Sequence, residues 1–368
     1  MGNNGAQAFY LLVAAGALLV VYTWIILPAP ALQNSGLKSA ACLQQPGARA
    51  YAWLSLKANV SLCVLNSVFR AVKQTEPGTV LASYFGAFLT SGVFIGTYES
   101  FRPRGRGLWA WAARGASLAF LAGQVVTAAV STPLYFALVA AATPAPLFKR
   151  TKSGDVLVEP RARPATEQVW AVLISTWVGF IAPFVHAKVT NFDFHALALW
   201  QPFPLYVLAL NLVLPSLLRP LVGKASPNLP IVLIALGGVY ASASVHLKYV
   251  WHLANLESGA LKAVRDAFLL YPLSEWAPDW ASNLPTLAHA IFGADFAFVF
   301  LANAAHVILG FEPGLDEAVA LAVNLLLGSA LLGPGAAVIL LWAYGELTAK
   351  ATLVASGKGQ AKGKGKAE

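Results

Sequence analysis

Residues 287–309 read LAHAIFGADFAFVFLANAAHVIL, an apolar stretch of transmembrane length that contains a single formal charge, Asp295. A helix rises about 1.5 Å per residue, so about 20 apolar residues cross the hydrocarbon core of a bilayer. The stretch therefore predicts a membrane-spanning helix. It also places a carboxyl group beside hydrocarbon, where a charge is costly and commonly marks a functional site.

Stretches of the same kind recur along the chain, in which 58% of the residues are hydrophobic and 11% are charged. The mean hydropathy is +0.64. The predicted spans are Ala8–Leu27, Val80–Thr97, Ala116–Ala141, Val169–Ala187, Ala196–Leu218, Leu229–Trp251, Leu287–Leu309 and Ala318–Tyr344. We expect an all-α, polytopic transmembrane helical bundle with about eight spans, or about seven to nine given the uncertainty of boundaries.

Two further segments have a helical pattern. Residues Tyr51–Val72 are interrupted by Lys57 and Arg70, so this segment spans the membrane, lies in the interface or packs inside the bundle. Residues Leu261–Leu270 place their apolar side chains on one face, which predicts an amphipathic helix on the membrane surface.

The distribution of polar residues predicts one membrane domain. No Pro/Gly/Ser-rich linker divides the apolar stretches, so residues 1–346 form a single domain, and the Gly- and Lys-rich residues 347–368 form a disordered basic tail. The net charge of +9 lies in loops and in this tail, as in multi-pass membrane proteins, so no nucleic-acid partner is expected. The tail favours a cytosolic side, and we expect an integral protein of the endoplasmic reticulum.

Glu99 and Arg102 end the second predicted span, three residues apart and on one face of a helix. One interpretation is an interfacial ion pair at the end of the span. The other is a carboxyl group in a partly dry pocket, with its acidity tuned by Arg102.

Asp295 has apolar neighbours on both sides, so a boundary charge is a poor explanation for it. Without a cation, burial keeps a carboxyl group protonated, and a neutral acid among aromatic rings is a proton donor for a weak base. The structural alternative is a helix cap just after Gly293.

Other polar residues have structural explanations of equal weight. Gln124, inside the third long span, bonds between helices or lines a cavity, and Asp193 suits an N-cap. Cys42 and Cys63 allow one disulfide at most and lack metal-ligand spacing, and we expect them to be unpaired.

Several function classes lack their sequence motifs. The chain contains no Walker A loop, dinucleotide fingerprint, His-Glu-x-x-His motif, nucleophile elbow or Asp-rich element for magnesium and diphosphate. We therefore predict no cofactor and no metal.

Short motifs in a fixed order carry a family resemblance. They are Glu99-Ser100-Phe101-Arg102, Ser131-Thr132-Pro133-Leu134-Tyr135-Phe136, Val178-Gly179-Phe180-Ile181-Ala182-Pro183, Trp200-Gln201-Pro202-Phe203-Pro204 and the segment centred on Asp295. This series, from about Val80 to Tyr344, resembles the fungal membrane-bound terpene cyclases of the ascochlorin and ascofuranone pathways.

The resemblance implies an enzyme of meroterpenoid biosynthesis in secondary metabolism. Its reaction is an isomerase- or lyase-type cyclisation of a lipid-soluble terpenoid or prenylated aromatic substrate, initiated by a proton and without loss of diphosphate. It implies that Glu99 and Asp295 are the acid and base and that Arg102 orients Glu99. Tyr135, Trp200 and Phe203 then line the pocket, and Gln124 is our further candidate for substrate binding.

Two other classes remain open. In a proton-coupled transporter, Glu99, Asp295 or the histidines relay protons across the membrane. In a non-catalytic membrane scaffold, both acids are bonded to structural partners and no enclosed pocket is expected. A cavity that both acids face would favour the cyclase.

Overall fold

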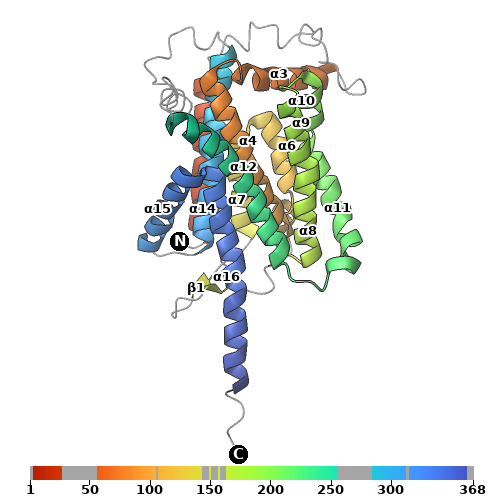
Figure 1. Cartoon of the computed structure of the whole chain (residues 1–368), viewed down its shortest axis with the longest axis vertical. Helices are drawn as coiled ribbons and strands as arrows, with labels where there is room; N and C mark the ends of the chain where they lie inside the picture. Colours follow the sequence, from red (N-terminus) through yellow and green to blue (C-terminus); the bar gives the residue numbers. More distant parts are fainter. Residues whose placement is uncertain are drawn as a thin grey trace, which may run out of the picture.

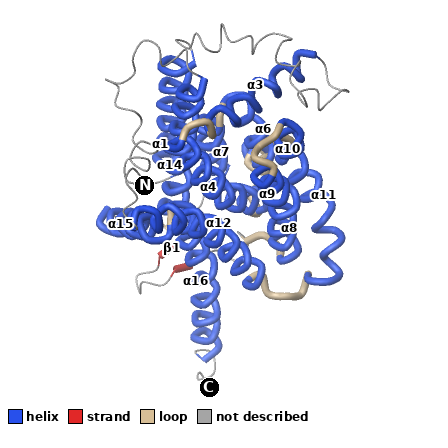
Figure 2. The backbone as a smooth tube through the Cα atoms, turned by 45° about the horizontal axis from the view of Figure 1, so that its top comes forward, coloured by secondary structure: helices blue, strands red, loops and turns tan. Residues whose placement is uncertain are grey.

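The structure is a computed structural model that describes residues 3–26, 56–104, 107–142, 149–150, 156–157, 163–254, 284–311 and 315–362. The described chain is almost entirely helical, as Figure 2 shows. In its first part, the helices are α1 (Asn3–Leu18), the π-helix η1 (Leu19–Ile26), α3 (Leu56–Val72), α4 (Glu76–Phe101), α5 (Leu108–Ala112), α6 (Ala116–Val126) and α7 (Ala128–Ala142).

The second part begins with a two-stranded antiparallel ribbon of β1 (Lys149–Arg150) and β2 (Val156–Leu157). The helices that follow are α8 (Thr166–Thr176), the π-helix η4 (Trp177–Ile181), α9 (Ala182–Val189), α10 (Phe194–Trp200), α11 (Phe203–Val222), α12 (Asn228–Ala254), α14 (Leu284–Gly310), α15 (Leu315–Leu332) and α16 (Pro334–Lys362).

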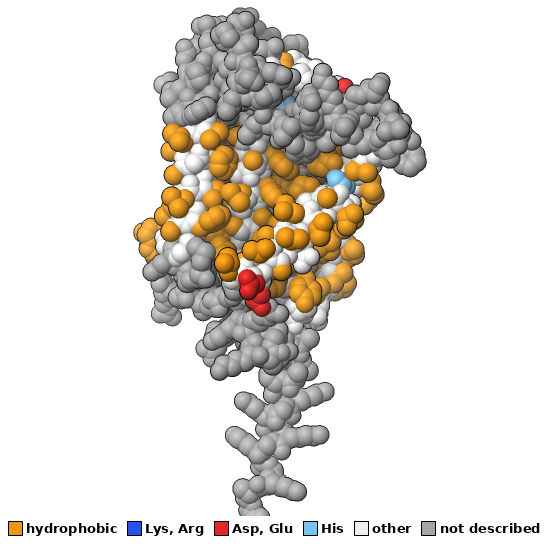
Figure 3. Space-filling view, turned by 90° about the vertical axis from the view of Figure 1, so that its left-hand side faces the viewer, with side chains coloured by type: hydrophobic (Ala, Val, Ile, Leu, Met, Phe, Trp, Pro, Cys, Tyr) orange, Lys and Arg blue, Asp and Glu red, His pale blue; other side chains and the backbone are white. Residues whose placement is uncertain are grey.

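Seven helical segments in the described chain are long and apolar enough to cross a membrane. They are Gly5–Tyr22, Glu76–Phe101, Thr166–Val189, Phe194–Val222, Asn228–Val250, Leu284–Gly310 and Leu315–Leu332. Figure 3 shows hydrophobic side chains spread as a broad band over one face, with acidic side chains at its margins. The predicted all-α polytopic bundle is therefore confirmed, with a span count inside the predicted range.

Helix α4 forms the centre of the bundle. It is the most buried of these seven segments and packs against α8, α12, α14 and α16. Its glycines allow close approach: a Cβ atom at Gly86 would lie 2.3 Å from the Phe184 ring, and one at Gly96 would lie 2.8 Å from the Phe120 ring. Thr75 caps its start by accepting a hydrogen bond from the Gly78 N–H.

Helix α3, the helical part of the doubtful segment Tyr51–Val72, lies across the upper end of the bundle in Figure 1. It packs on α4, α10 and α14 rather than running parallel to the long helices. Its interior polar positions explain this placement, because Asn66 and Ser67 are buried against the bundle while Arg70 stays exposed. The amphipathic segment predicted at Leu261–Leu270 lies outside the described residues.

Two predicted spans are each divided in two. Ala116–Ala141 breaks at Thr127, whose φ of 72° ends α6 before α7 begins. Ala318–Tyr344 breaks at Gly333, whose φ of 88° separates α15 from α16. A positive φ ends a helix, and Pro334 cannot donate the hydrogen bond that would continue it. The predicted single spans were therefore wrong at these two places.

Helix α16 continues past residue 346, where the sequence places the start of the basic tail. In Figure 1 it extends well below the other helices. The residues after Glu346 include Leu347, Ala349, Lys350 and Ala351, most of which have high helix propensity. The division at residue 346 into a membrane domain and a disordered tail stays a prediction.

Cys63 is buried and disulfide-bonded, so the expectation of unpaired cysteines was wrong. The other cysteine of the sequence, Cys42, lies outside the described residues. Sequence spacing alone gave no sign of this bond, because two cysteines 21 positions apart fit no metal or redox motif.

Candidate functional site

A cavity of about 560 Å³ lies between the upper helix α3 and the helices α4, α6, α7, α10, α11 and α14. Its walls are mostly apolar, and six aromatic residues contribute to them: Phe69, Phe85, Phe120, Trp200, Phe203 and Phe292. The remaining lining residues include Gln124, Thr127, Ser131, Thr132, Asp295 and Asn303. Among the described lining residues, Asp295 alone carries an ionisable side chain, so any charge inside the cavity is concentrated at one point.

Asp295 is held at this wall by the break between α6 and α7. The Ala129 N–H donates a hydrogen bond to Asp295 Oδ1 at 2.7 Å, and the Ala128 amide and Thr127 hydroxyl lie beside the same carboxyl group. The first N–H groups of a helix have no partner within the helix and favour negative charge. Asp295 therefore caps α7, rather than its own helix as the structural alternative supposed.

Asp295 combines a structural contact with a position at the cavity wall. The side chain is 9% exposed and lines the cavity, while the start of α7 stabilises negative charge on it. A carboxyl group in this setting can release a proton into the cavity and leave a carboxylate that the α7 amides accommodate. The same carboxylate can accept a proton afterwards.

Aromatic rings enclose the space opposite this carboxyl. Trp200 stacks on Phe203 with ring centroids 5.7 Å apart, and Phe69 meets Trp200 edge to face at 5.1 Å. Phe69 also meets Phe292 edge to face at 4.9 Å. The sequence named Trp200 and Phe203 as pocket residues, and it missed Phe69, Phe120 and Phe292 because aromatic residues are too common in this chain for any one to stand out.

Among the described lining residues, three buried side-chain atoms have no hydrogen-bond partner, namely Asn303 Oδ1, Trp200 Nε1 and Thr127 Oγ1, the last of which lies beside Asp295. The Asn303 Nδ2 group donates to the Val299 carbonyl at 2.9 Å, which fixes the orientation of the amide. An unpaired buried polar atom costs free energy, so a ligand with one donor and one acceptor would suit this cavity. Asn303 could have been found from the sequence, because it lies two helical turns after Asp295 and therefore on the same face of the helix.

Glu99 and Arg102 belong to a different, fully buried cluster. Arg102 Nε donates to Glu99 Oε1 at 2.8 Å and to Oε2 at 2.9 Å, and Arg102 Nη2 pairs with Glu346. The Tyr98 hydroxyl donates to Glu346 Oε2 at 2.7 Å. We call Glu99, Arg102 and Glu346 the buried ion triad. Arg104 reaches Glu99 at 3.4 Å and His306 reaches it at 3.6 Å.

The structure therefore separates the predicted site residues into two groups. Asp295, Trp200, Phe203 and Gln124 line the cavity, whereas Glu99 and Arg102 are not among its described lining residues, so this cavity is not one that both acids face. The Glu99–Arg102 pair is an ion pair, as one interpretation supposed, yet it is buried and extended by Glu346. The sequence missed Glu346 because it appeared to mark the start of the polar tail.

Tyr135 connects the two groups without lining the cavity. Its hydroxyl lies 3.0 Å from the Gly96 carbonyl and 3.2 Å from the Ala113 carbonyl, so it joins α7 to α4 and to the turn after α5. Its predicted role in shaping the pocket is thus indirect, through the placement of α7 and of the break that holds Asp295. The three other site residues named for substrate binding lie at the cavity wall.

Comparison with known proteins gives one result. The sequence model of the CtvD domain matches residues 60–347, which include α4, the cavity and the buried ion triad. Neither a curated protein nor a solved structure matches the chain. The matched region covers well over half of the sequence, and the chain therefore belongs to the CtvD domain family.

Proposed function

We propose that this protein is a membrane terpene cyclase that closes rings on a prenylated aromatic or linear terpenoid substrate. The reaction starts with a proton, needs no loss of diphosphate, and is an isomerisation overall. The cavity supports this substrate class, because it lies in a membrane bundle and its aromatic and aliphatic walls suit a hydrocarbon chain that partitions into lipid.

The observation that carries this proposal is the single carboxyl group of Asp295 in an apolar, aromatic cavity. An alkene or epoxide is a weak base, so its protonation requires an acid placed in a site that stabilises the developing cation. Asp295 supplies the acid, and the α7 amides stabilise the carboxylate that remains.

Asp295 both donates the first proton and accepts the last one, so no second acid or base is needed. Asp295 transfers its proton to a terminal epoxide oxygen or alkene carbon, and the epoxide C–O bond or the alkene π bond breaks. An internal double bond then attacks the cationic carbon and forms the new C–C bond. The final cation loses a proton to the Asp295 carboxylate, or an internal hydroxyl captures it and releases its proton there.

The aromatic walls protect the intermediate cation. The π faces of Trp200 and Phe203 attract positive charge, and the apolar lining excludes water that would quench it. In this proposal the buried ion triad acts from outside the cavity as a positioning element. It fixes the lower part of α4 to α16, and Tyr135 fixes α4 to the helix that Asp295 caps.

One observation favours a second candidate, a proton-coupled transporter. Glu99, His306 and Glu346 are ionisable groups inside the bundle, and such groups often relay protons. Their mutual pairing speaks for a structural role instead, because a relay needs a carboxyl group that can be protonated without breaking an ion pair. A pH-dependent flux in proteoliposomes would support the transporter.

The test replaces Asp295 by asparagine in the full-length protein, assayed in microsomes with an epoxidised prenyl-aromatic substrate. The amide oxygen of asparagine can still accept the Ala129 N–H, so the α7 cap remains while the acidic proton is lost. Asp316→Asn, an exposed change at the start of α15, is the matched control. We expect no cyclised product from Asp295→Asn and normal product from Asp316→Asn.

A further inference from the structure

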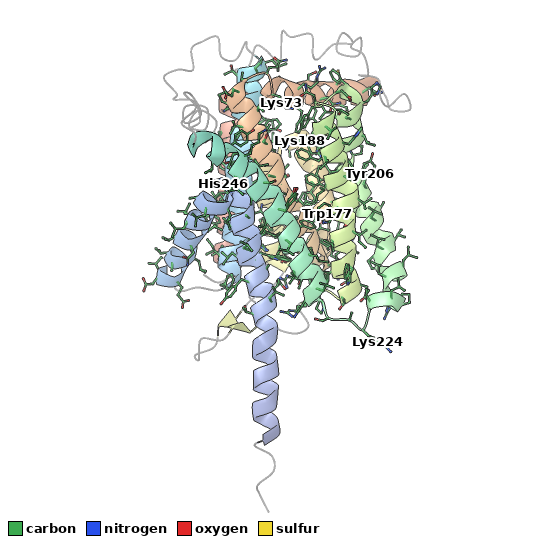
Figure 4. The ribbon with its side chains drawn as sticks, in the orientation of Figure 1. Lys73, Trp177, Lys188, Tyr206, Lys224 and His246 are labelled. Atoms are coloured by element: carbon green, nitrogen blue, oxygen red, sulfur yellow. The ribbon has the colours of Figure 1, made fainter. Side chains whose placement is uncertain are left out.

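Three lysines from different elements are near enough for their charges to interact. Lys73 follows α3, Lys188 lies in the last turn of α9, and Lys248 lies in α12. Figure 4 shows Lys73 and Lys188 in this upper part, whereas Lys224 lies at the lower end of the bundle. We call Lys73, Lys188 and Lys248 the lysine cluster.

The three positive charges are close enough to affect one another. The pKa of Lys73 is lowered by its burial and also by the charges of Lys188 and Lys248. Like charges at this range repel, so the cluster costs free energy unless an anion compensates it.

No carboxylate compensates the cluster within the described part of the chain, where no ion pair joins these lysines to an acid. The nearest acids in sequence have other roles. Asp193 accepts the Ala196 N–H at 2.7 Å as the cap of α10, and Glu76 is exposed at the start of α4.

Lys73 is fixed by neutral neighbours. Its Nζ atom donates to Asn191 Oδ1 at 3.0 Å and lies 4.3 Å from the centre of the Phe192 ring. These contacts orient the ammonium group without neutralising it. An ammonium group makes three hydrogen bonds, so capacity remains for an oxyanion.

The surroundings of Lys73 show what the anion is attached to. Lys73 lines a small hollow whose other walls are apolar, and this hollow shares Phe69, Phe85, Leu89, Trp200 and Phe292 with the large cavity. The hollow holds only about 10 Å³, so a hydrocarbon chain would pack along the apolar side chains at its mouth while its charged group contacts the lysines. A free inorganic ion would satisfy the lysines alone.

We propose that the lysine cluster binds the oxyanion head of an amphiphile, a phosphate or carboxylate carried on a hydrocarbon chain. The source is either an anionic phospholipid or an acidic group of a lipid-soluble substrate. This binding does not depend on the cyclase reaction.

The experiment measures the thermal stability of the full-length protein in dodecyl maltoside with dodecyl phosphate, with inorganic phosphate in parallel. Wild type is compared with the triple variant Lys73→Met, Lys188→Met, Lys248→Met and with the control Lys224→Met. We expect a saturable rise in melting temperature with dodecyl phosphate. The affinity for dodecyl phosphate should fall about fivefold for each cluster lysine replaced, because the attraction of one lysine to an anionic membrane has this size. Lys224→Met should bind as wild type.

A second arm identifies the source. Wild type and the triple variant are reconstituted in phosphatidylcholine nanodiscs with added phosphatidylserine, and the retained lipid is counted by native mass spectrometry. Lysine-dependent retention of phosphatidylserine assigns the site to a phospholipid head. Binding of dodecyl phosphate alone assigns it to a single-chain, substrate-like amphiphile, and both results support the site.

Three results would overturn it: no saturable effect in wild type, an equal effect of inorganic phosphate, or equal weakening by Lys224→Met. If the triple variant does not fold, the single variant Lys188→Met and its Lys188→Arg counterpart replace it, since this side chain is exposed. Asp295→Asn should still bind dodecyl phosphate, so a failure of the cyclase proposal and a failure of this site give different results.

Discussion

Replacement of Glu346 by glutamine should destabilise the protein, because Glu346 is a fully buried carboxylate that pairs with Arg102 and accepts the Tyr98 hydroxyl. Glutamine keeps the shape of the side chain and can still accept from Tyr98, so the change removes mainly the charge. Removal of one partner of a buried ion pair costs about 3–5 kcal/mol. Glu99 still binds Arg102 through two contacts, so we expect a loss in the free energy of unfolding at the lower end of this range, about 3 kcal/mol.

Arg102→Met should be more severe than Glu346→Gln, because it removes the cation that Glu99 and Glu346 share and leaves Glu99 with the longer 3.4 Å contact to Arg104. We expect a loss of about 5 kcal/mol, the upper end for a broken buried pair. The triple variant Glu99→Gln, Arg102→Met, Glu346→Gln should recover part of this loss, because it removes both carboxylates that Arg102 neutralised; recovery is only partial because Arg104 loses its ion pair with Glu99.

The assay is thermal unfolding of the detergent-solubilised full chain, followed by fluorescence-detected size exclusion. For a chain of 368 residues, about 3 kcal/mol corresponds to a fall of roughly 4 °C in melting temperature. Asp316→Asn is the control at an exposed carboxylate. The reasoning is refuted if Glu346→Gln melts with the control, or if the neutral triple variant is less stable than Arg102→Met.

Two further predictions concern the backbone break and the disulfide. Gly333→Ala should lower the free energy of unfolding by about 1–2 kcal/mol, because a φ of 88° is strained for alanine and the new Cβ would lie 2.8 Å from Ser242 Oγ. The control Gly16→Ala, whose new Cβ has its nearest contact at 3.8 Å, should leave the stability unchanged. Equal melting temperatures of the two variants would contradict this prediction. Cys63 should resist alkylation in intact microsomes until a reductant is added, because it is disulfide-bonded, and labelling without reductant would show a free thiol.

The membrane spans were predictable because hydropathy is a property of whole segments, and a run such as residues 287–309 leaves few alternatives. The breaks at Thr127 and Gly333 were not, because each depends on the conformation of one residue inside a run that remains apolar. The proline after Gly333 is compatible with a helix break, but prolines are common inside membrane helices and do not by themselves predict one.

The candidate site was predictable in part. Asp295 stood out because it is a lone acid in an apolar run, and Trp200 and Phe203 stood out through their motif. The partner of Arg102 could not be found, because Glu346 lies 244 positions away and its pairing arises only when α4 packs on α16. Long-range polar contacts of this kind leave no local pattern in a sequence.

Asp295 is the residue on which the account depends, and product formation by Asp295→Asn in microsomes tests it most directly. The assay requires equal amounts of wild type, Asp295→Asn and Asp316→Asn, each shown to be folded by its melting temperature. If Asp295 is the proton donor, wild type and Asp316→Asn form cyclised product and a folded Asp295→Asn protein forms none. Normal cyclisation by a folded Asp295→Asn protein would contradict it.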